Sequence, residues 1–503
     1  LLNESCFEGN TKMTGVTLGE NLTQIGIKAF NGCSSLTGNL VIPDKVGSIG
    51  NSAFANTKIT SLTLGSGVKT IGTSASKRAG KGGTLIIPAA VTSVGASAFE
   101  GCAITGLTVN STQAEFAAGA FKNGVNSTGG LSVGGQNTIR KGAFEGCKFK
   151  NITLTGEATV DEKCFEGYTL LTGQVSIDAG VNLGDHAFSG CTGFTSIKLN
   201  TGVTEVPNYA FYGCTGVTTL TIASTTLQTI GNCAFSDTQF TNTLTITESV
   251  ASIGVSAFDG CNKFKTLTIE GAVQLQWKAF KGCTGIIGTV TLPEGTQLGE
   301  SVFEGCTGIT GLGLPTSWQV TYGEKAFKNC TNLTNIVVNG NTTVDVTVGT
   351  GMTTIPKEVF YGCKKLKVTT LRIAEGVQTI GDYAFCDCMQ MAMKTGELTR
   401  VTSVYLPSTL TEIGTFALAP CGTTTDHFAV NNHTFQHCYS LAATPPTLGA
   451  KVFSKWTIMP FIPNSYQKTY LYVPGASYLS YKNSDWGTQV FQDTANQILE
   501  YPA

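Results

Sequence analysis

A pattern of about 23 residues repeats along this chain and constrains its fold more than any other feature. One copy begins at Leu244-Thr245-Ile246, and the next begins 23 residues later at Leu267-Thr268-Ile269. Between them come an Ile-Gly pair, an Ala-Phe pair and a Cys three residues after the Phe. Repeats of this length are typical of solenoids, in which each coil packs only on its neighbours. The sequence therefore predicts a repeat solenoid.

Each part of the repeat has a physical role in such a coil. Leu244-Thr245-Ile246 alternates apolar and polar residues, as in a short strand with one face inward. Gly254 fits a position where a close approach excludes a side chain. Ala257 and Phe258 supply a small and a large core group, and we expect each ring to lie over the small residue of a neighbouring coil. The predicted core column contains Phe30, Phe54, Phe99, Phe144, Phe188, Phe211, Phe235, Phe258, Phe280, Phe303 and Phe327.

The full pattern is L-x-x-L-x-L-P-x-x-L-x-x-I-G-x-x-A-F-x-x-C-x-x, with the proline kept in Leu292-Pro293, Leu314-Pro315 and Leu406-Pro407. Over nearly the whole chain it resembles the BspA-like (Treponema pallidum-type) leucine-rich repeat surface proteins, several of them from gut anaerobes. The resemblance implies a right-handed superhelix of 22–24-residue coils with short parallel β-strands and little helix. It also implies that the L-x-L strand lies on the concave face.

The repeat register divides the chain into a solenoid and a terminal segment. We expect a solenoid of about 19 coils over residues 1–440, with insertions near residues 339–351 and 389–399. The first insertion should form a loop or small hairpin. Residues 441–503 are expected to form a degenerate coil and a cap, because the last coil of an array exposes an apolar face. A strand from Leu471 to Val473 and a short helix near Ala476 to Asn483 would supply that cap.

Most of the cysteines occupy one position of the repeat, which favours buried free thiols over a disulfide framework. Stacked coils would hold their Cβ atoms near the strand spacing, wider than the roughly 3.8 Å that a disulfide requires. A few local bridges remain the alternative, and Cys386 and Cys233 lie off the column. The column contains Cys33, Cys102, Cys147, Cys191, Cys214, Cys261, Cys283, Cys306, Cys330, Cys363, Cys388, Cys421 and Cys438.

Composition excludes several classes of function. Only 13% of the residues are charged and the net charge is −1, which argues against a nucleic-acid surface. No apolar run approaches the roughly eighteen residues of a transmembrane segment. Leu1 to Gly9 already match the repeat, so we expect that a leader peptide precedes them in the natural protein. The expected location is extracellular or at the cell surface.

The sequence contains no recognisable catalytic or cofactor motif. No nucleophile elbow, P-loop or dinucleotide fingerprint is present, and the carboxylates are scattered around coil turns. His433 and His437 are four residues apart and could chelate a metal if helical, but polar surface histidines are the preferred interpretation. We therefore predict no enzyme activity, no catalytic residue, no cofactor and no metal site.

The candidate binding residues lie at the outward position of the L-x-L strand. Threonine is common there, either as a good strand residue or as a hydroxyl-lined surface for peptides or glycans. Lys198, Arg372, Tyr405 and Tyr472 interrupt this row, and Tyr and Arg are frequent binding anchors. Together with the family resemblance, this predicts adhesion to a host matrix or cell-surface protein. A glycan-binding accessory protein of a gut bacterium and a structural spacer are the alternatives.

Overall fold

In a computed structural model, the chain divides into two compact units, Leu1–Asn242 and Thr243–Ala503. The structure describes residues 1–79, 83–127, 129–317, 319–338, 341–343, 345–388, 403–418, 437–449, 470–474, 477–486 and 498–500.

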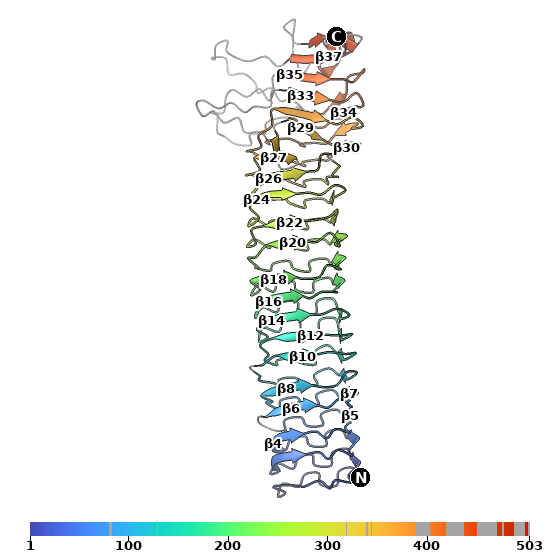
Figure 1. The fold of residues 1–503 in the computed structure, drawn as a ribbon, viewed down its shortest axis with the longest axis vertical. Helices are drawn as coiled ribbons and strands as arrows, with labels where there is room; N and C mark the ends of the chain where they lie inside the picture. Colours follow the sequence, from blue (N-terminus) through green and yellow to red (C-terminus); the bar gives the residue numbers. More distant parts are fainter. Residues whose placement is uncertain are drawn as a thin grey trace. The chain divides into compact units, whose positions relative to one another are not determined.

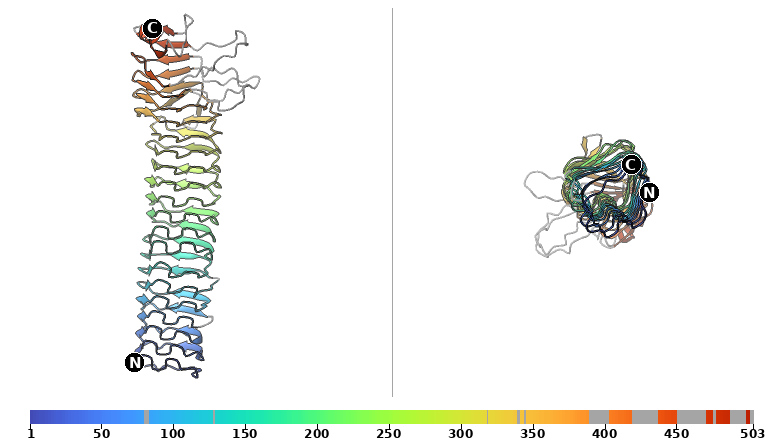
Figure 2. Two further views of the ribbon diagram at one scale, coloured as in Figure 1. Left: turned by 180° about the vertical axis from the view of Figure 1, so that it is seen from behind. Right: turned by 90° about the horizontal axis from the view of Figure 1, so that it is seen from below.

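Each unit is a parallel β-solenoid, as the repeat predicts (Figures 1 and 2). A coil contributes one longer strand, which we call the broad strand, and, after a turn, one strand of two residues. The two kinds form separate stacked columns. Leu131 pairs with Ile152, and Ile152 with Val175, so equivalent residues of successive coils lie side by side. The inward residues of one coil therefore meet their own counterparts in the next.

The broad strands of the first unit are β2 (Thr37–Val41), β4 (Lys58–Thr63), β6 (Thr84–Ile87), β8 (Gly106–Val109), β10 (Leu131–Val133), β12 (Ile152–Leu154), β14 (Gly173–Ile177), β16 (Phe194–Leu199) and β18 (Thr219–Ile222). Its short strands are β1 (Gln24–Ile25), β3 (Ser48–Ile49), β5 (Thr70–Ile71), β7 (Ser93–Val94), β9 (Glu115–Phe116), β11 (Thr138–Ile139), β13 (Thr159–Val160), β15 (Asn182–Leu183), β17 (Glu205–Val206) and β19 (Thr229–Ile230).

The broad strands of the second unit are β20 (Leu244–Ile246), β22 (Leu267–Ile269), β24 (Gly288–Thr291), β26 (Ile309–Leu314), β27 (Asn335–Val338), β29 (Asp345–Val348), β31 (Thr370–Ile373), β33 (Ser403–Leu406), β35 (His437–Ser440), β37 (Tyr470–Val473) and β38 (Ile498–Glu500). Its short strands are β21 (Ser252–Ile253), β23 (Gln274–Leu275), β25 (Gln297–Leu298), β30 (Thr354–Ile355), β32 (Thr379–Ile380), β34 (Glu412–Ile413) and β36 (Thr447–Leu448).

The repeat phenylalanines form the core of both units. All eleven rings named above are at most 1% exposed. Each ring stacks on the ring of the neighbouring coil rather than on its alanine: Phe258 and Phe280 have centroids 5.1 Å apart and planes 1° apart. Ring-on-ring stacking follows from the register, because identical positions of adjacent coils coincide. Such aromatic pairs add about 0.5–1.5 kcal/mol each beyond the area they bury.

The corner around each Phe turns sharply through two left-handed residues. One lies two positions before the Phe, as at Lys325 with φ 58°, and the other two positions after it, as at Gly305 with φ 75°. The glycine of the Ile-Gly pair serves the close approach expected from the sequence. A Cβ added to Gly299 would lie 2.9 Å from the carbonyl carbon of Gln276 in the preceding coil.

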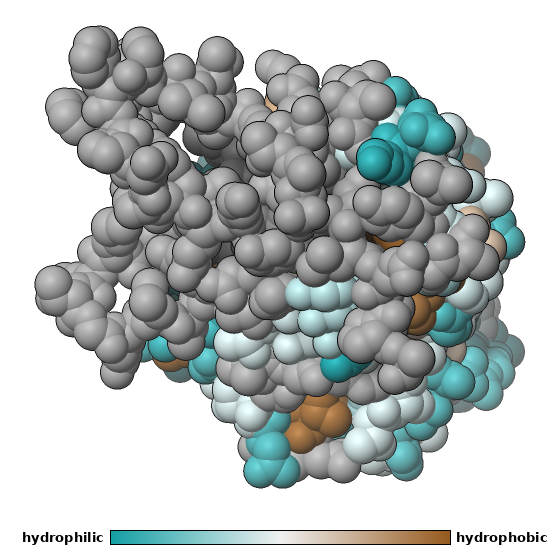
Figure 3. All heavy atoms as spheres, turned by 90° about the horizontal axis from the view of Figure 1, so that it is seen from above, coloured by the Kyte–Doolittle hydropathy of each residue, from teal (hydrophilic) through white to brown (hydrophobic). Residues whose placement is uncertain are grey.

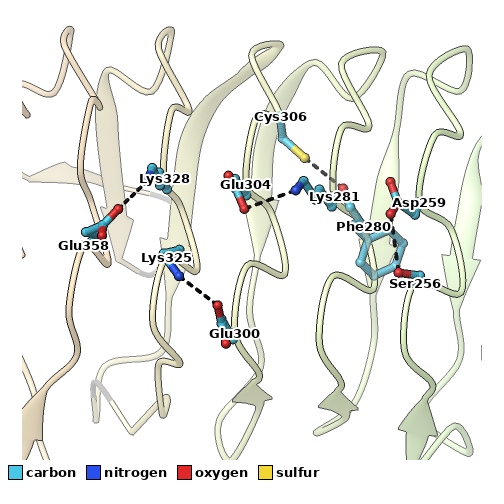
Figure 4. Close-up of polar contacts among 10 residues, drawn as sticks. All are labelled: Ser256, Asp259, Phe280, Lys281, Glu300, Glu304, Cys306, Lys325, Lys328 and Glu358. Carbon is cyan, nitrogen blue, oxygen red and sulfur yellow. Dashed lines mark hydrogen bonds and ion pairs between the residues drawn. The ribbon is translucent and has the colours of Figure 1, made fainter.

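The column cysteines that the structure describes are buried free thiols, as predicted. They also hydrogen-bond across coils: the Cys306 Sγ donates to the Phe280 carbonyl oxygen at 3.1 Å (Figure 4). Burial raises the pKa of these thiols, for Cys147 to about 11 and for Cys330 to about 12, so they remain protonated donors at neutral pH. Cys386, off the column, is disulfide-bonded. Cys421 lies outside the described residues.

Ion pairs cross the coil corners of the second unit (Figure 4). The Lys325 Nζ lies 2.9 Å from the Glu300 Oε1, and the Lys281 Nζ lies 3.5 Å from the Glu304 Oε2. Lys328 pairs with Glu358 in the same way. These side chains are partly exposed, so each pair contributes at most about 1 kcal/mol.

The first insertion forms the expected hairpin. The strand β28 (Asn341–Thr343) pairs antiparallel with β27, and β29 then starts the next part of the parallel column beside β31. The second insertion, near residues 389–399, lies outside the described residues, as does the methionine cluster within it.

The terminal segment contains the predicted strand and helix. The strand β37 is followed by α1 (Tyr478–Lys482). Tyr481 is fully buried and its hydroxyl donates to the Ala442 carbonyl oxygen at 3.1 Å, while the Trp486 Nε1 donates to the Pro446 carbonyl oxygen at 2.8 Å. Both rings thus anchor the segment on the preceding coil. Across the described residues, the structure has no helix of the length and apolarity needed to cross a bilayer.

Candidate functional site

The broad strands near the end of the second unit align one cationic and three aromatic side chains. Arg372 on β31 pairs in register with Tyr405 on β33, Tyr405 with Tyr439 on β35, and Tyr439 with Tyr472 on β37. Their neighbours along the strands, such as Val404, are buried, whereas these four side chains are only partly buried. Strand alternation therefore points the row outward. We call Tyr405, Tyr439 and Tyr472 the tyrosine ladder.

The three rings of the tyrosine ladder are stacked face to face. The centroids of Tyr405 and Tyr439 are 4.4 Å apart with planes 7° apart, and those of Tyr439 and Tyr472 are 4.6 Å apart with planes 14° apart. The guanidinium carbon of Arg372 lies 3.9 Å from the Tyr405 centroid. This cation–π contact covers the first ring of the ladder and contributes about 0.5–1 kcal/mol at a surface.

This stacking determines which chemical groups the ladder can offer a partner. Both faces of Tyr439 are covered by rings, and the faces of Tyr405 are covered by Tyr439 and Arg372. A partner can therefore meet these two rings only at their edges and phenol groups. Ring edges carry the positive end of the aromatic quadrupole, and a phenol both donates and accepts hydrogen bonds. The ladder is thus suited to carbonyl, carboxylate and apolar groups approaching from the side.

The structure brings together three of the four predicted binding residues. Arg372, Tyr405 and Tyr472 share this row, whereas Lys198 lies on β16 of the first unit between Ser176 and Thr221. Lys198 is partly buried and takes no part in the ladder.

Tyr439 is the member that sequence reasoning missed, because the repeat spacing breaks down after Leu418. A usable signal was present, since Cys438-Tyr439 repeats the pair of an apolar residue and a Tyr seen in Val404-Tyr405 and Leu471-Tyr472. Aligning it with Val404-Tyr405-Leu406 gives the register that the structure has.

No group of metal-ligating side chains occurs in the part of the chain that the structure describes. Chelation of a metal by His433 and His437 would require a helix, but His437 lies on the strand β35. His427 and His433 lie outside the described residues. The coloured side chains visible in the end view of Figure 3 are mostly hydrophilic or neutral, with small apolar patches between them.

Comparison with known proteins relates the chain to one repeat family. The family model described as "BspA type Leucine rich repeat region" matches residues 1–128, 134–181, 159–287, 271–390 and 353–447. No curated protein sequence matches the chain.

Solved structures with a similar fold come from several bacteria. A leucine-rich repeat protein of Bacteroides ovatus is 21% identical, with 86% of this chain and 87% of that chain covered and a TM-score of 0.37. A leucine-rich cell surface protein of Faecalibacterium prausnitzii is 20% identical over 69% of this chain and 79% of that chain, with a TM-score of 0.33. The family model spans most of the repeats, and the chain belongs to the BspA-type leucine-rich repeat family.

Proposed function

We propose that this protein is a secreted or cell-surface adhesion protein that binds another protein through the tyrosine ladder and catalyses no reaction. Family membership supports a macromolecule-binding role, since repeat solenoids present extended surfaces to partners. The observation that carries the assignment to a site is the row of Arg372 and three tyrosines in register on four successive broad strands. Tyr and Arg are the residue types enriched at binding hot spots.

The stacking within the ladder favours a protein over a glycan. A sugar that binds an aromatic residue by stacking needs an open ring face. Here the faces of Tyr405 and Tyr439 lie against each other and against Arg372 or Tyr472. Ring edges and phenol groups instead fit backbone carbonyls and side chains of a polypeptide. The proposal therefore places protein recognition ahead of the glycan alternative.

The test compares variants of the full chain on two arrays, one of extracellular-matrix and cell-surface proteins and one of glycans. Tyr405, Tyr439 and Tyr472 are replaced together by alanine. Thr268→Ala with Thr291→Ala is the control, because these exposed threonines occupy outward positions of β22 and β24 in the same unit. Circular dichroism and thermal unfolding verify the fold of each variant.

We expect at least one protein ligand whose affinity falls by about tenfold or more in the tyrosine variant and stays unchanged in the threonine control. Tyr→Phe at the same three positions separates the phenol hydrogen bonds from the stacked rings. Binding of glycans alone would assign the alternative function. A protein ligand that binds the tyrosine variant as well as the unchanged chain would remove the site, and no ligand on either array would favour the structural spacer.

A further inference from the structure

The outward residues of the broad strands form a file along the second unit, and its first members are small. Thr245 on β20 pairs in register with Thr268 on β22, and the repeat places Thr291 on β24 at the equivalent position, 23 residues after Thr268. Thr291 then pairs with Gly313 on β26, which adds no side chain to the face. Thr268 and Thr291 are exposed, and Thr245 is partly exposed. We call Thr245, Thr268, Thr291 and Gly313 the small half of the file.

The same file ends with large side chains. Gly313 pairs with Val337 on β27, and beyond the hairpin Thr347 on β29 pairs with Arg372. Arg372 and the three residues of the tyrosine ladder then complete the file, and we call these four residues its large half. The broad strands from β20 to β37 stack one above another on one side of the second unit (Figure 1), so both halves belong to the same face.

The order of side-chain sizes along the file is self-complementary. When a second copy is turned end over end about an axis parallel to the strands, the two faces meet with their files superposed and reversed in direction. Because both halves have the spacing of paired strands, each large residue then lies opposite a small one. Contacts in which one patch meets itself across a two-fold axis are the commonest among protein oligomers. The pairs are Tyr472 with Thr245, Tyr439 with Thr268, Tyr405 with Thr291, and Arg372 with Gly313.

The paired groups also match in chemistry. A phenol and a threonine hydroxyl each donate and accept hydrogen bonds, so a buried pair of them can satisfy both groups. The threonine methyl group offers an apolar contact to the edge of the ring. At the fourth pair, the Arg372 guanidinium lies over the Tyr405 ring, and Gly313 opposite it has no side chain that would occupy the same space.

The face is large enough for a specific interface between two copies. The ten broad strands from β20 to β37, at about 4.8 Å each, span roughly 45 Å, and two outward residues per strand give a width of roughly 13 Å. Each copy would then bury on the order of 600 Å², and the pair about 1,200 Å², which is the lower end for stable and specific interfaces. An interface of this size favours a reversible dimer over a permanent one.

We propose that the tyrosine ladder binds a second copy of this chain, with the large half of each file packed against the small half of the other. This inference rests on the proposed function, because it takes the ladder as a protein-binding surface and names the partner. The contact is homophilic, so copies on facing surfaces can adhere to one another. A foreign protein ligand of the ladder competes with the second copy for the same residues.

The experiment measures self-association of the full chain by sedimentation velocity over a range of concentrations, and we expect a reversible equilibrium between monomer and dimer. Tyr405→Thr leaves a gap opposite Thr291, and Thr291→Tyr places two rings where one fits, so each should weaken the dimer by about tenfold or more. The double variant again places one Tyr opposite one Thr and should restore dimerisation. Such a rescue reports contact across the dimer, because Thr291 on β24 and Tyr405 on β33 lie on separate strands of one copy.

Thr108→Tyr is the matched control, because Thr108 is an exposed outward residue of β8 in the first unit and lies outside the file. It should dimerise as the unchanged chain does. A chain that stays monomeric at every concentration would overturn the inference, and so would a double variant that is not rescued; a foreign ligand that depends on the ladder would still support the proposed function. Dimerisation that responds to these variants, with no ligand on either array, would support the inference and remove adhesion to other proteins.

Discussion

Single residues of the coil corner are chosen for backbone conformation as much as for packing. The position two residues after the Phe is left-handed in coil after coil, as at Gly305 with φ 75° and Asn329 with φ 60°. Glycine adopts this conformation without strain, asparagine tolerates it, and other residues are disfavoured there. The glycine of the frequent Gly-Cys pair therefore marks the left-handed turn, and this turn places the cysteine that follows it.

Gly305→Ala tests this conformational role in isolation. No atom lies within 4 Å of the Cβ that alanine would add, so the cost should come from the left-handed backbone alone. We expect the free energy of unfolding to fall by about 1–2 kcal/mol. Gly305→Asn should cost less, because Asn329 already occupies the same position of the next coil. Urea unfolding followed by circular dichroism measures both.

Gly19→Ala is the matched control for this series. Its added Cβ also meets no atom within 4 Å, and its φ is outside the left-handed region. Its free energy of unfolding should change little or rise slightly. A cost at Gly19 equal to that at Gly305 would mean that side-chain volume, and not the backbone conformation, governs the substitution.

At the scale of elements, the stacked phenylalanine column joins each coil to the next. Phe280 lies between the rings of Phe258 and Phe303, at centroid distances of 5.1 Å and 5.5 Å. Phe280→Ala should therefore lower the free energy of unfolding by about 3–5 kcal/mol by leaving a cavity between coils. Thr291→Ala, at an exposed position of β24, should change it by less than about 0.5 kcal/mol.

Thermal and urea unfolding of both variants measure this difference. Similar losses from Phe280→Ala and Thr291→Ala would reverse the assignment of inner and outer faces. A small loss at Phe280 would instead mean that the coils close over the missing ring. Because solenoid stability is a sum of coil and interface terms, the transition should also become broader or biphasic in Phe280→Ala.

The sequence predicted the coil and the buried ring column because both follow from the regular spacing of the repeat residues. It did not predict what depends on backbone placement. The thiol of Cys306 could be placed in the core, but its hydrogen bond to the Phe280 carbonyl requires the register of two coils. Lys325 has a left-handed φ of 58°, which a lysine in the sequence does not predict. Tyr439 was hidden because its coil departs from the repeat length.

The candidate binding site also divides into features that the sequence predicted and features that it did not. Arg372, Tyr405 and Tyr472 were found from their outward strand position, which a period of two determines. Their mutual stacking and the resulting cover of the ring faces emerge only from the alignment of β31, β33, β35 and β37.

At the scale of the whole molecule, the buried thiols couple stability to alkaline pH. Thiols of both units have raised pKa values because burial disfavours the thiolate: Cys147 to about 11, and Cys102, Cys214 and Cys330 to about 12, from 9.0 in an exposed thiol. The folded chain therefore keeps protons that the unfolded chain releases above pH 9. Deprotonation of the unfolded state then favours unfolding.

The free energy of unfolding should accordingly be constant with respect to these thiols below about pH 9 and fall as the pH rises toward 11–12. Each thiol that stays protonated contributes a slope of about 1.36 kcal/mol per pH unit. Urea unfolding between pH 8 and about pH 11 measures the total slope.

Cys214→Ala combined with Cys330→Ala should lower that slope by about two thiol equivalents, although each substitution also removes a buried group and lowers stability at pH 7. The change in slope is the decisive quantity, because lysine and tyrosine titrations add the same background to both chains. An unchanged slope would mean that the thiols ionise equally well in the folded and unfolded states. The column thiols would then be accessible to water in the folded chain.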